Sequence, residues 1–218
     1  MLNNMDRINN VIFDLGGVIL DIDLLKGMTA MKQLGITNFE SSNEKVNHMK
    51  TFMDFEKGLI SEAGFIEKLK EENEADFSNN DFIDAWNEII LGFQQERIDL
   101  IANLKKSARF RTFLLSNTNS LHKDLYTRIL REEHSVGGLE ELFDNVYFSH
   151  EIYMRKPEPV IYHYVLNTEG LIPEQTLFID DSPANIETAQ SLGMETFHLS
   201  DGVTINDLFS EQQVARWI

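Results

Sequence analysis

The chain has 218 residues, of which 42% are hydrophobic and 25% charged, and its formal net charge is −17. This length suits one large domain or a core domain with a smaller one, and the negative charge disfavours nucleic acid and anionic membranes as partners. The sequence has no cysteine, no apolar run near the ~20 residues that span a bilayer, and a polar start without a secretory stretch. We therefore expect a cytoplasmic protein that acts on a small molecule. An anionic substrate would need a local cation to offset the overall charge.

Short, continuous apolar runs mark the expected strands, because the strands of a parallel sheet are buried on both faces. The clearest runs end abruptly in polar residues, and they cover residues 11–14, 112–117 and 177–181. Weaker candidates cover residues 145–149 and 195–199.

Helical patterns follow two of these runs. Pro159 opens a helix that stops near Gly170, and Ser182-Pro183 provides an N-cap and first residue for another that stops at Gly193. Alternating strands and helices predict an α/β fold with a doubly wound, Rossmann-like parallel sheet.

The segment between the first two clear strands breaks this alternation. Its helical patterns are too extensive for a single crossover, and they cover residues 24–34, 43–57, 61–72 and 81–93. We interpret them as an inserted all-helical cap, entered near residues 21–23. The expected domains are an α/β core of residues 1–21 and 94–218, and a cap of residues 22–93. Cap residues facing the site would select the substrate, and His48, Met49 and Glu56 are candidates.

Polar side chains follow the three clear strands where each strand ends. They are Asp14, the pair Ser116-Asn117 and the pair Asp180-Asp181. The carboxyl ends of the strands in an open parallel sheet form the ligand-binding edge. Crowded carboxylates need a cation between them, and hard oxygen ligands suit Mg²⁺. Lys156, just before the helix that Pro159 opens, adds a basic residue.

Four segments together resemble the ordered motifs of the haloacid dehalogenase-like hydrolases. They read FDLGGV at 13–18, LSNTN at 115–119, RKPEP at 155–159 and FIDDS at 178–182. The resemblance runs from residue 11 to about residue 200, with the cap matched by position and helicity only. Within the family the chain is most similar to bacterial sugar-phosphate (glucose-1-phosphate) phosphatases and to the phosphatase domain of soluble epoxide hydrolases.

The resemblance implies a role for each motif. Asp14 would be the nucleophile and form an aspartyl-phosphate, and Lys156 would be the fixed cation that also contacts the substrate. Ser116 and Asn117 would hydrogen-bond the phosphate. Mg²⁺ would bind the Asp14 carboxylate, the backbone carbonyl of Gly16 and the carboxylate of Asp181, with Asp180 beside it. The expected activity is hydrolysis of a small phosphorylated metabolite, such as a sugar phosphate.

Gly16 departs from the family pattern. Most phosphatases of the family have a second aspartate two residues after the nucleophile, which protonates the leaving group and then activates water. General acid–base help of this kind is worth ~10²–10⁴-fold in rate. Slow turnover or a substitute acid is therefore expected, with Asp21 and Asp23 as the nearest candidates in sequence. Good leaving groups, such as anomeric, acyl or aryl phosphates, would suffer least.

Other interpretations remain open at this stage. Taken alone, Asp14 before two glycines also fits a strand-ending turn, and Lys156 fits a surface lysine. A 2-haloacid dehalogenase would share the aspartate nucleophile without the second aspartate, but the Asp180-Asp181 pair speaks for phosphoryl chemistry. A phosphate-binding pseudoenzyme is a third possibility that Gly16 would explain. A mutase ranks lower, because mutases of the family need the residue that Gly16 replaces.

Overall fold

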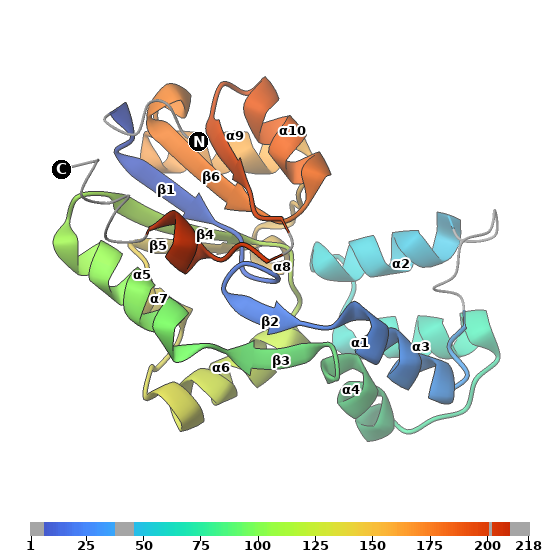
Figure 1. Ribbon diagram of the computed structural model, residues 1–218. Helices are drawn as coiled ribbons and strands as arrows, with labels where there is room; N and C mark the ends of the chain where they lie inside the picture. Colours follow the sequence, from blue (N-terminus) through green and yellow to red (C-terminus); the bar gives the residue numbers. More distant parts are fainter. Residues whose placement is uncertain (1–6, 38–45, 201, 210–218) are drawn as a thin grey trace.

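A central parallel sheet organises the computed structural model, which describes residues 7–37, 46–200 and 202–209, with backbone alone at 46–49. Its five strands run in the order β5-β4-β1-β6-β7 (Figure 1). They are β1 (Asn10–Phe13), β4 (Arg111–Ser116), β5 (Asn145–Phe148), β6 (Thr176–Asp180) and β7 (Glu195–His198). The predicted α/β, Rossmann-like fold is confirmed, and the two weaker strand candidates are present.

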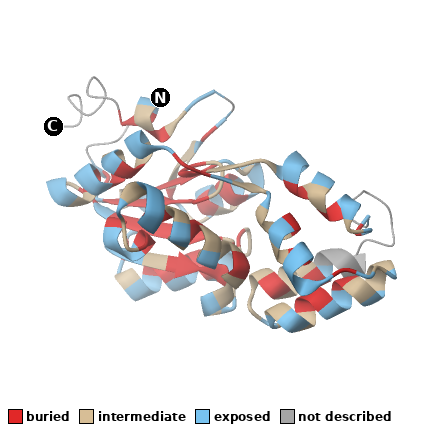
Figure 2. Ribbon diagram, turned by 90° about the horizontal axis from the view of Figure 1, so that it is seen from below, coloured by how far each residue is buried: buried red, intermediate tan, exposed pale blue. Residues whose placement is uncertain are grey.

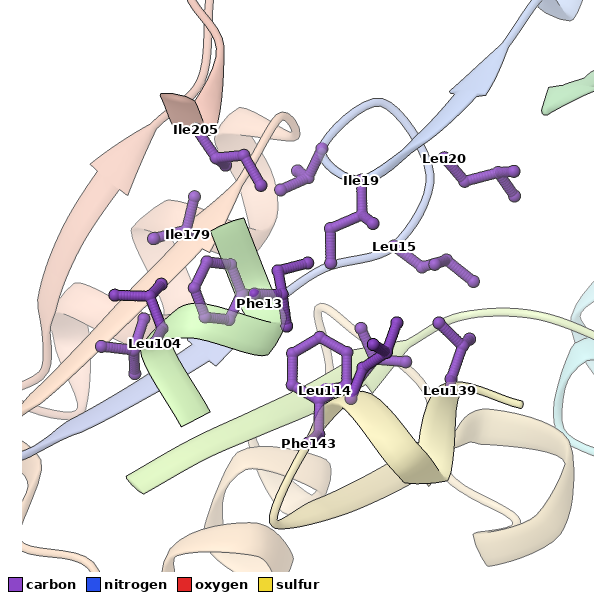
Figure 3. Packing of buried hydrophobic residues seen from close by; sticks show 14 of the residues in the cluster. Phe13, Leu15, Ile19, Leu20, Leu104, Leu114, Leu139, Phe143, Ile179 and Ile205 are labelled. Atoms are coloured by element: carbon purple, nitrogen blue, oxygen red, sulfur yellow. The ribbon is translucent and has the colours of Figure 1, made fainter. Parts of the chain in front are cut away.

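Helices cover both faces of the sheet, because successive strand side chains point to opposite sides. Phe13 and Val11 face one core, which Figure 3 shows from close by, and Ile12 faces the other. The first core packs against α5 (Gln95–Ser107), α6 (Ser120–His134), α7 (Leu139–Leu142) and α11 (Ile205–Leu208). The second packs against α9 (Pro159–Glu169) and α10 (Pro183–Ser191).

Short elements complete the core, and glycine ends the helix that Pro159 opens. The remaining elements are α8 (Ser149–Ile152) and the 3₁₀ turn η3 (Pro173–Gln175). Gly170 follows α9 with a φ of 63°, a left-handed conformation that glycine adopts without steric penalty. No helix in the described part of the chain is long and apolar enough to cross a membrane.

Four helices between β2 and β3 form a separate group with its own aromatic core (Figures 1 and 2). They are α1 (Leu24–Gln33), α2 (Val46–Glu56), α3 (Glu62–Asn73) and α4 (Asn79–Asn87). Phe65 is fully buried at its centre, against Phe55, Phe82 and Trp86. This group corresponds to the expected cap, and the domain limits at residues 21/22 and 93/94 stay a prediction. The start of the expected helix at 43–57 lies outside the described residues, as do the side chains of His48 and Met49.

The helix predicted over residues 81–93 is wrong in its second half. The helix α4 ends at Asn87, and the strand β3 (Ile90–Phe93) follows and pairs antiparallel with β2 (Leu20–Ile22). Gly92 has a φ of 114°, which no helix allows. The two-stranded ribbon crosses the expected limit at residues 21/22 and ends at the expected limit at 93/94. Its pairing joins segments about 70 residues apart, so local periodicity could not reveal it.

Replacing Phe13 by alanine tests the core under the first strand. The Phe13 side chain is fully buried, with ring centroids 5.9 Å from those of both Phe143 and Phe209. We expect Phe13→Ala to lower the free energy of unfolding by about 3–5 kcal/mol, because a large cavity remains. Urea unfolding measures this loss. The matched control is Leu91→Ala, at a side chain that is 54% exposed, and an equal loss in both variants would contradict the packing described.

Candidate active site

The sheet order brings the three motif-bearing strands together. The strand β1 lies between β4 and β6, with Phe13 in register with Leu114 on one side and Ile179 on the other. Asp14 therefore leaves the sheet beside the ends of both neighbours. The chain builds outward from β1 through β4 to β5 on one side, and through β6 to β7 on the other. Such a switch point is where open α/β sheets bind ligands.

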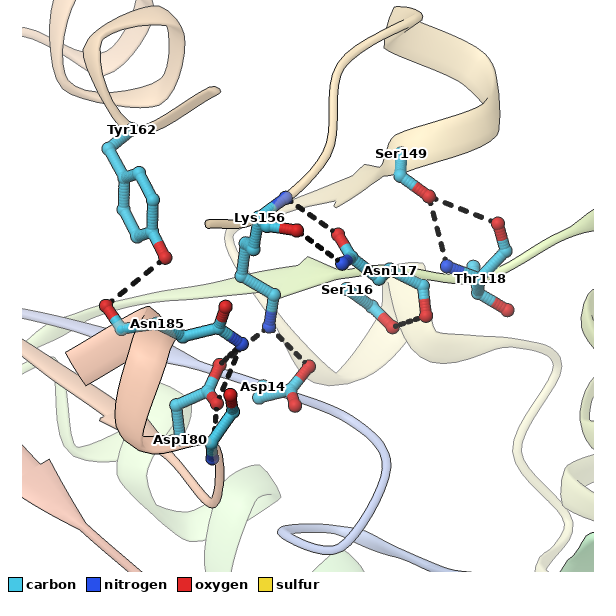
Figure 4. A network of polar contacts seen from close by, with 10 residues as sticks. Asp14, Ser116, Asn117, Thr118, Ser149, Lys156, Tyr162, Asp180 and Asn185 are labelled. Carbon is cyan, nitrogen blue, oxygen red and sulfur yellow. Dashed lines mark hydrogen bonds and ion pairs between the residues drawn. The ribbon is translucent and has the colours of Figure 1, made fainter. Parts of the chain in front are cut away.

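A buried lysine holds this edge of the sheet together. The Lys156 Nζ lies 2.6 Å from Asp14 Oδ1 and 2.7 Å from Asp180 Oδ2 (Figure 4). Its side chain is 1% exposed, so its ammonium is compensated by these two carboxylates rather than by water. An uncompensated charge at this depth would be strongly destabilising. The alternative interpretation of Lys156 as a surface lysine is therefore wrong.

Asp180 is fully engaged by protein donors. Its Oδ1 accepts hydrogen bonds from the Ser182 amide (2.8 Å) and from Asn185 Nδ2 (2.9 Å). Its Oδ2 accepts from Lys156 Nζ and from the same Asn185 amide at 3.0 Å. Ser182 is the N-cap residue of α10, but its side chain makes no capping bond. Asp180 instead binds the backbone amide of Ser182 itself. Asp180 thereby acts as a support within the site.

Asp181 differs from its neighbour because it is exposed. Carboxylate oxygens of Asp14, Asp180 and Asp181 all lie within 4.8 Å of one another, and no other described residues form such an acidic or histidine group. The Asp181 carboxylate lies directly over Gly17, where a Cβ would overlap Oδ2. Gly17 also has a φ of 73°, so the turn after Asp14 needs glycine for two independent reasons.

Asn117 is bonded to the backbone of Lys156 on both edges of its amide. Its Nδ2 donates to the Lys156 carbonyl at 2.8 Å, and its Oδ1 accepts from the Lys156 amide at 2.9 Å. Its side chain therefore fixes the lysine backbone, and the phosphate contact expected of Asn117 stays a prediction. Ser116 lies buried at the end of β4, where its hydroxyl makes a long bond of 3.4 Å to the Asn117 carbonyl.

Sequence reasoning missed three supporting residues. Asn185 holds Asp180, while Ser149 accepts from the Thr118 amide and donates to its carbonyl, both at 3.0 Å (Figure 4). Asn185 comes three residues after the fourth resembling segment, so its position was visible and its role was not. The Ser149–Thr118 pair joins the segments that follow β5 and β4, and no local pattern signals it.

Asp14 carries a strongly perturbed carboxyl group. Burial raises the pKa of Asp14 to about 7, and Asp180 adds to the rise, while Lys156 opposes it. Burial and the adjacent Asp180 likewise raise the pKa of Asp181. These shifts follow from several carboxyl groups sharing a poorly hydrated space, and a bound cation would reverse them.

The two substitute acids suggested by the sequence have structural partners. Asp21 forms an ion pair with Arg97 at 2.6 Å and accepts from Gln94. Asp23 caps the helix α1 by accepting from the Lys26 amide at 3.0 Å. Both carboxylates are therefore held at the base of the cap by contacts of their own.

Comparison with known proteins identifies the family. Residues 8–193 match the haloacid dehalogenase-like hydrolases. The D-ribitol-5-phosphate phosphatase of Bacteroides thetaiotaomicron is 32% identical over 201 residues, which cover 89% of this chain and 93% of that protein. The bifunctional epoxide hydrolase 2 of Rattus norvegicus is 33% identical over 103 residues, 46% of this chain and 17% of that protein.

A solved structure gives the same answer. A haloacid dehalogenase family enzyme from Bacteroides thetaiotaomicron, in complex with magnesium and inorganic phosphate, superposes with a TM-score of 0.79 at 32% identity, over 93% of this chain and 99% of that one. The chain belongs to the haloacid dehalogenase-like hydrolase family, and the family resemblance predicted from the motifs is confirmed.

The raised pKa of Asp14 predicts a pH-dependent stability in the absence of divalent cations. The folded pKa of about 7 lies above the ordinary value of 3.8, so the fold favours the neutral carboxyl. Its stabilising contribution is complete below 3.8 and is lost as the pH rises through about 7. With chelator present, the wild type should lose stability between pH 5 and pH 8 relative to Asp14→Asn. Urea unfolding of both proteins measures the difference, and parallel pH curves would contradict it.

Proposed function

We propose that the protein is a Mg²⁺-dependent phosphatase that hydrolyses a small sugar or polyol phosphate through an aspartyl-phosphate on Asp14. The observation that carries this proposal is the Lys156 ammonium held between Asp14 and Asp180, with the exposed Asp181 beside them. It combines a nucleophile, a fixed cation and a vacant carboxylate at one edge of the sheet. The phosphatase and the magnesium–phosphate complex among the relatives support the same chemistry.

The donor set fits magnesium. When all are ionised, the three carboxylates and the Lys156 ammonium carry a net charge of −2, which a divalent cation neutralises. All the side-chain donors are hard oxygens, as Mg²⁺ prefers. Asp14 and Asp181 would hold the ion together with the Gly16 carbonyl, and Asp180, whose oxygens are occupied, would support them. Bound Mg²⁺ supplies positive charge to the phosphoryl oxygens and favours the ionised form of Asp14.

In the first step, an Asp14 carboxylate oxygen attacks phosphorus, and the bond from phosphorus to the leaving oxygen breaks. Lys156 holds the nucleophile in place through its 2.6 Å contact and offers its charge to the transferring group. Ser116, whose hydroxyl lies at the same edge, donates to a phosphoryl oxygen. Water then hydrolyses the aspartyl-phosphate, which releases inorganic phosphate and restores Asp14.

The substrate class follows from charge and from the relatives. A chain with a net charge of −17 repels anions, so a phosphate ester depends on Lys156 and on the metal for its attraction. The Bacteroides relative is named for a polyol phosphate, and a carbohydrate phosphatase from Thermotoga maritima matches over 29% of this chain. A compact, hydroxyl-rich monophosphate is the class we assign.

A substrate panel tests the proposed function. We would measure phosphate release from ribitol 5-phosphate, a hexose 1-phosphate, an acyl phosphate and an aryl phosphate, with Mg²⁺ and with chelator. We expect Mg²⁺-dependent release that falls to background in Asp14→Asn, because the amide is no nucleophile. Phosphate binding without release from any substrate would mean a pseudoenzyme, and halide release from a 2-haloacid would mean a dehalogenase.

Restoring an acid at position 16 tests the role of Gly16. A Cβ there would lie 3.3 Å from Ile22 Cδ1, the tip of a flexible side chain, and Gly16 has no positive φ. Gly16→Asp is therefore accommodated. We expect it to raise kcat at least about tenfold for an alkyl phosphate, and less for an aryl phosphate whose leaving group needs no proton. Gly16→Asn, of the same shape without the acid, is the control, and equal rates in both variants would contradict this account.

A further inference from the structure

The turn of residues 155–158, here called the Lys156 turn, displays the central cation of the site. The Glu158 amide closes it by donating to the Arg155 carbonyl at 3.0 Å. On the core side, Asn117 holds the Lys156 backbone through the two hydrogen bonds described above. The residues that flank Lys156 and Pro157 are contacted from the other side, by the cap.

Two consecutive residues of the cap grip the two ends of this turn. Glu56, the last residue of α2, accepts at Oε2 from Arg155, whose Nε and Nη2 each lie 2.9 Å away. Lys57 Nζ lies 2.6 Å from Glu158 Oε1. The polarity is crossed, with an acid of the cap on a base of the turn and then the reverse. A shift in register would place like charges together, so the pattern specifies one docked position.

The backbone of the cap meets the core beside these pairs. Gly58 has a φ of 66°, and a Cβ there would overlap the carbonyl oxygen of His150 in α8. Two backbone hydrogen bonds close the end of α2. The Gly58 amide donates to the Phe55 carbonyl at 2.9 Å, and the Leu59 amide donates to the Asp54 carbonyl at 2.8 Å. The end of α2 therefore abuts the short helix that leads into the Lys156 turn.

The ion pair between Arg155 and Glu56 is partly buried and interacts electrostatically with Lys156. The Arg155 and Glu56 side chains are 18% and 29% exposed, so their pairing is less screened than that of a surface ion pair. Burial raises the pKa of Glu56, and both Arg155 and Lys156 oppose the rise. The Glu56 carboxylate of the cap therefore interacts electrostatically with the Lys156 ammonium.

We propose that Arg155 is a positioning residue that couples cap docking to the placement of Lys156. The planar guanidinium grips Glu56 with two donors, so the turn is fixed from the cap as well as from Asn117. Docking of the cap then completes the geometry in which Lys156 holds Asp14. This inference rests on the proposed function, in which Lys156 acts on the phosphoryl group.

Kinetics on the aryl phosphate test the coupling, because this substrate offers no hydroxyl for the cap to bind. We expect Glu56→Gln and Arg155→Met each to lower kcat about 10- to 100-fold with a smaller change in KM, since small misplacements at a reacting centre have effects of this size. The double variant should be no slower than the worse single variant, because one contact is lost in each case. Arg155→Lys should restore part of the rate.

The matched control is Arg111→Met. It removes an arginine of similar pairing, 2.6 Å from Glu169, at the opposite end of β4 from the site. We expect its kcat to stay near that of the wild type. Wild-type kcat in Glu56→Gln and Arg155→Met would overturn the coupling. Losses confined to hydroxyl-bearing substrates would also overturn it, because they would make the pair a substrate contact.

Amide hydrogen exchange gives a readout that does not depend on activity. Positions 157 and 159 are proline, so a short peptide over the turn reports on the amides of Arg155, Lys156 and Glu158. We expect the hydrogen-bonded amides of Lys156 and Glu158 to exchange at least about tenfold faster in Glu56→Gln and Arg155→Met, and at an unchanged rate in Arg111→Met. Unchanged exchange in all variants would refute the coupling. If the wild type released no phosphate from any substrate, the proposed function would fail while exchange still decided the coupling.

Discussion

The structure of the site depends on one buried ammonium. Lys156 has almost no contact with water, and two carboxylates within 2.7 Å compensate its charge. The same charge allows Asp14 and Asp180 to lie close together in a poorly hydrated space. Asparagine side chains support both ends of the arrangement, Asn117 at the lysine backbone and Asn185 at Asp180. Such support stabilises an ionised carboxylate at the end of a buried strand.

This arrangement leaves a net negative charge that a bound cation can neutralise. With Lys156 balancing one carboxylate, the site keeps two negative charges and one exposed aspartate over a glycine turn. A divalent cation neutralises that charge, and a phosphate ester can then bind to positive charge within a protein whose net charge is −17. Gly17 matters here because any side chain would displace Asp181. Gly16 matters because its position has room for an acidic side chain that glycine lacks.

The cap contacts two segments at the ligand-binding edge of the sheet, the Lys156 turn and residues 116–119. The end of α2 meets the Lys156 turn through Glu56, Lys57 and Gly58. The helix α4 meets the 116–119 segment, where Trp86 Nε1 donates to Asn119 Oδ1 at 3.3 Å and His122 contacts the Trp86 carbonyl at 3.1 Å. Burial lowers the pKa of His122 to about 4, so this second contact is made by a neutral imidazole. One contact is ionic and the other is a neutral hydrogen-bonded stack.

The sequence by itself determined the fold class, the five strands of the central sheet and the members of the acidic site. Apolar runs that stop at Asp14, Ser116 and Asp180 predict these features locally. A run of consecutive apolar residues indicates a buried strand, and the polar residue that follows it marks where the strand ends. The same holds for Pro159 and Gly170, which bound a helix through their own backbone preferences.

The tertiary structure alone decided which partner each polar group takes. The β2–β3 ribbon, the Asn117 bonds to the Lys156 backbone and the Glu56–Arg155 pair join residues from 39 to 99 positions apart. Asp180 and Asp181 are adjacent in sequence, yet one is saturated by protein donors and the other is exposed, because the chain turns between them into α10. Local pattern specifies which side chains reach the edge of the sheet, and packing between distant segments decides what each one binds.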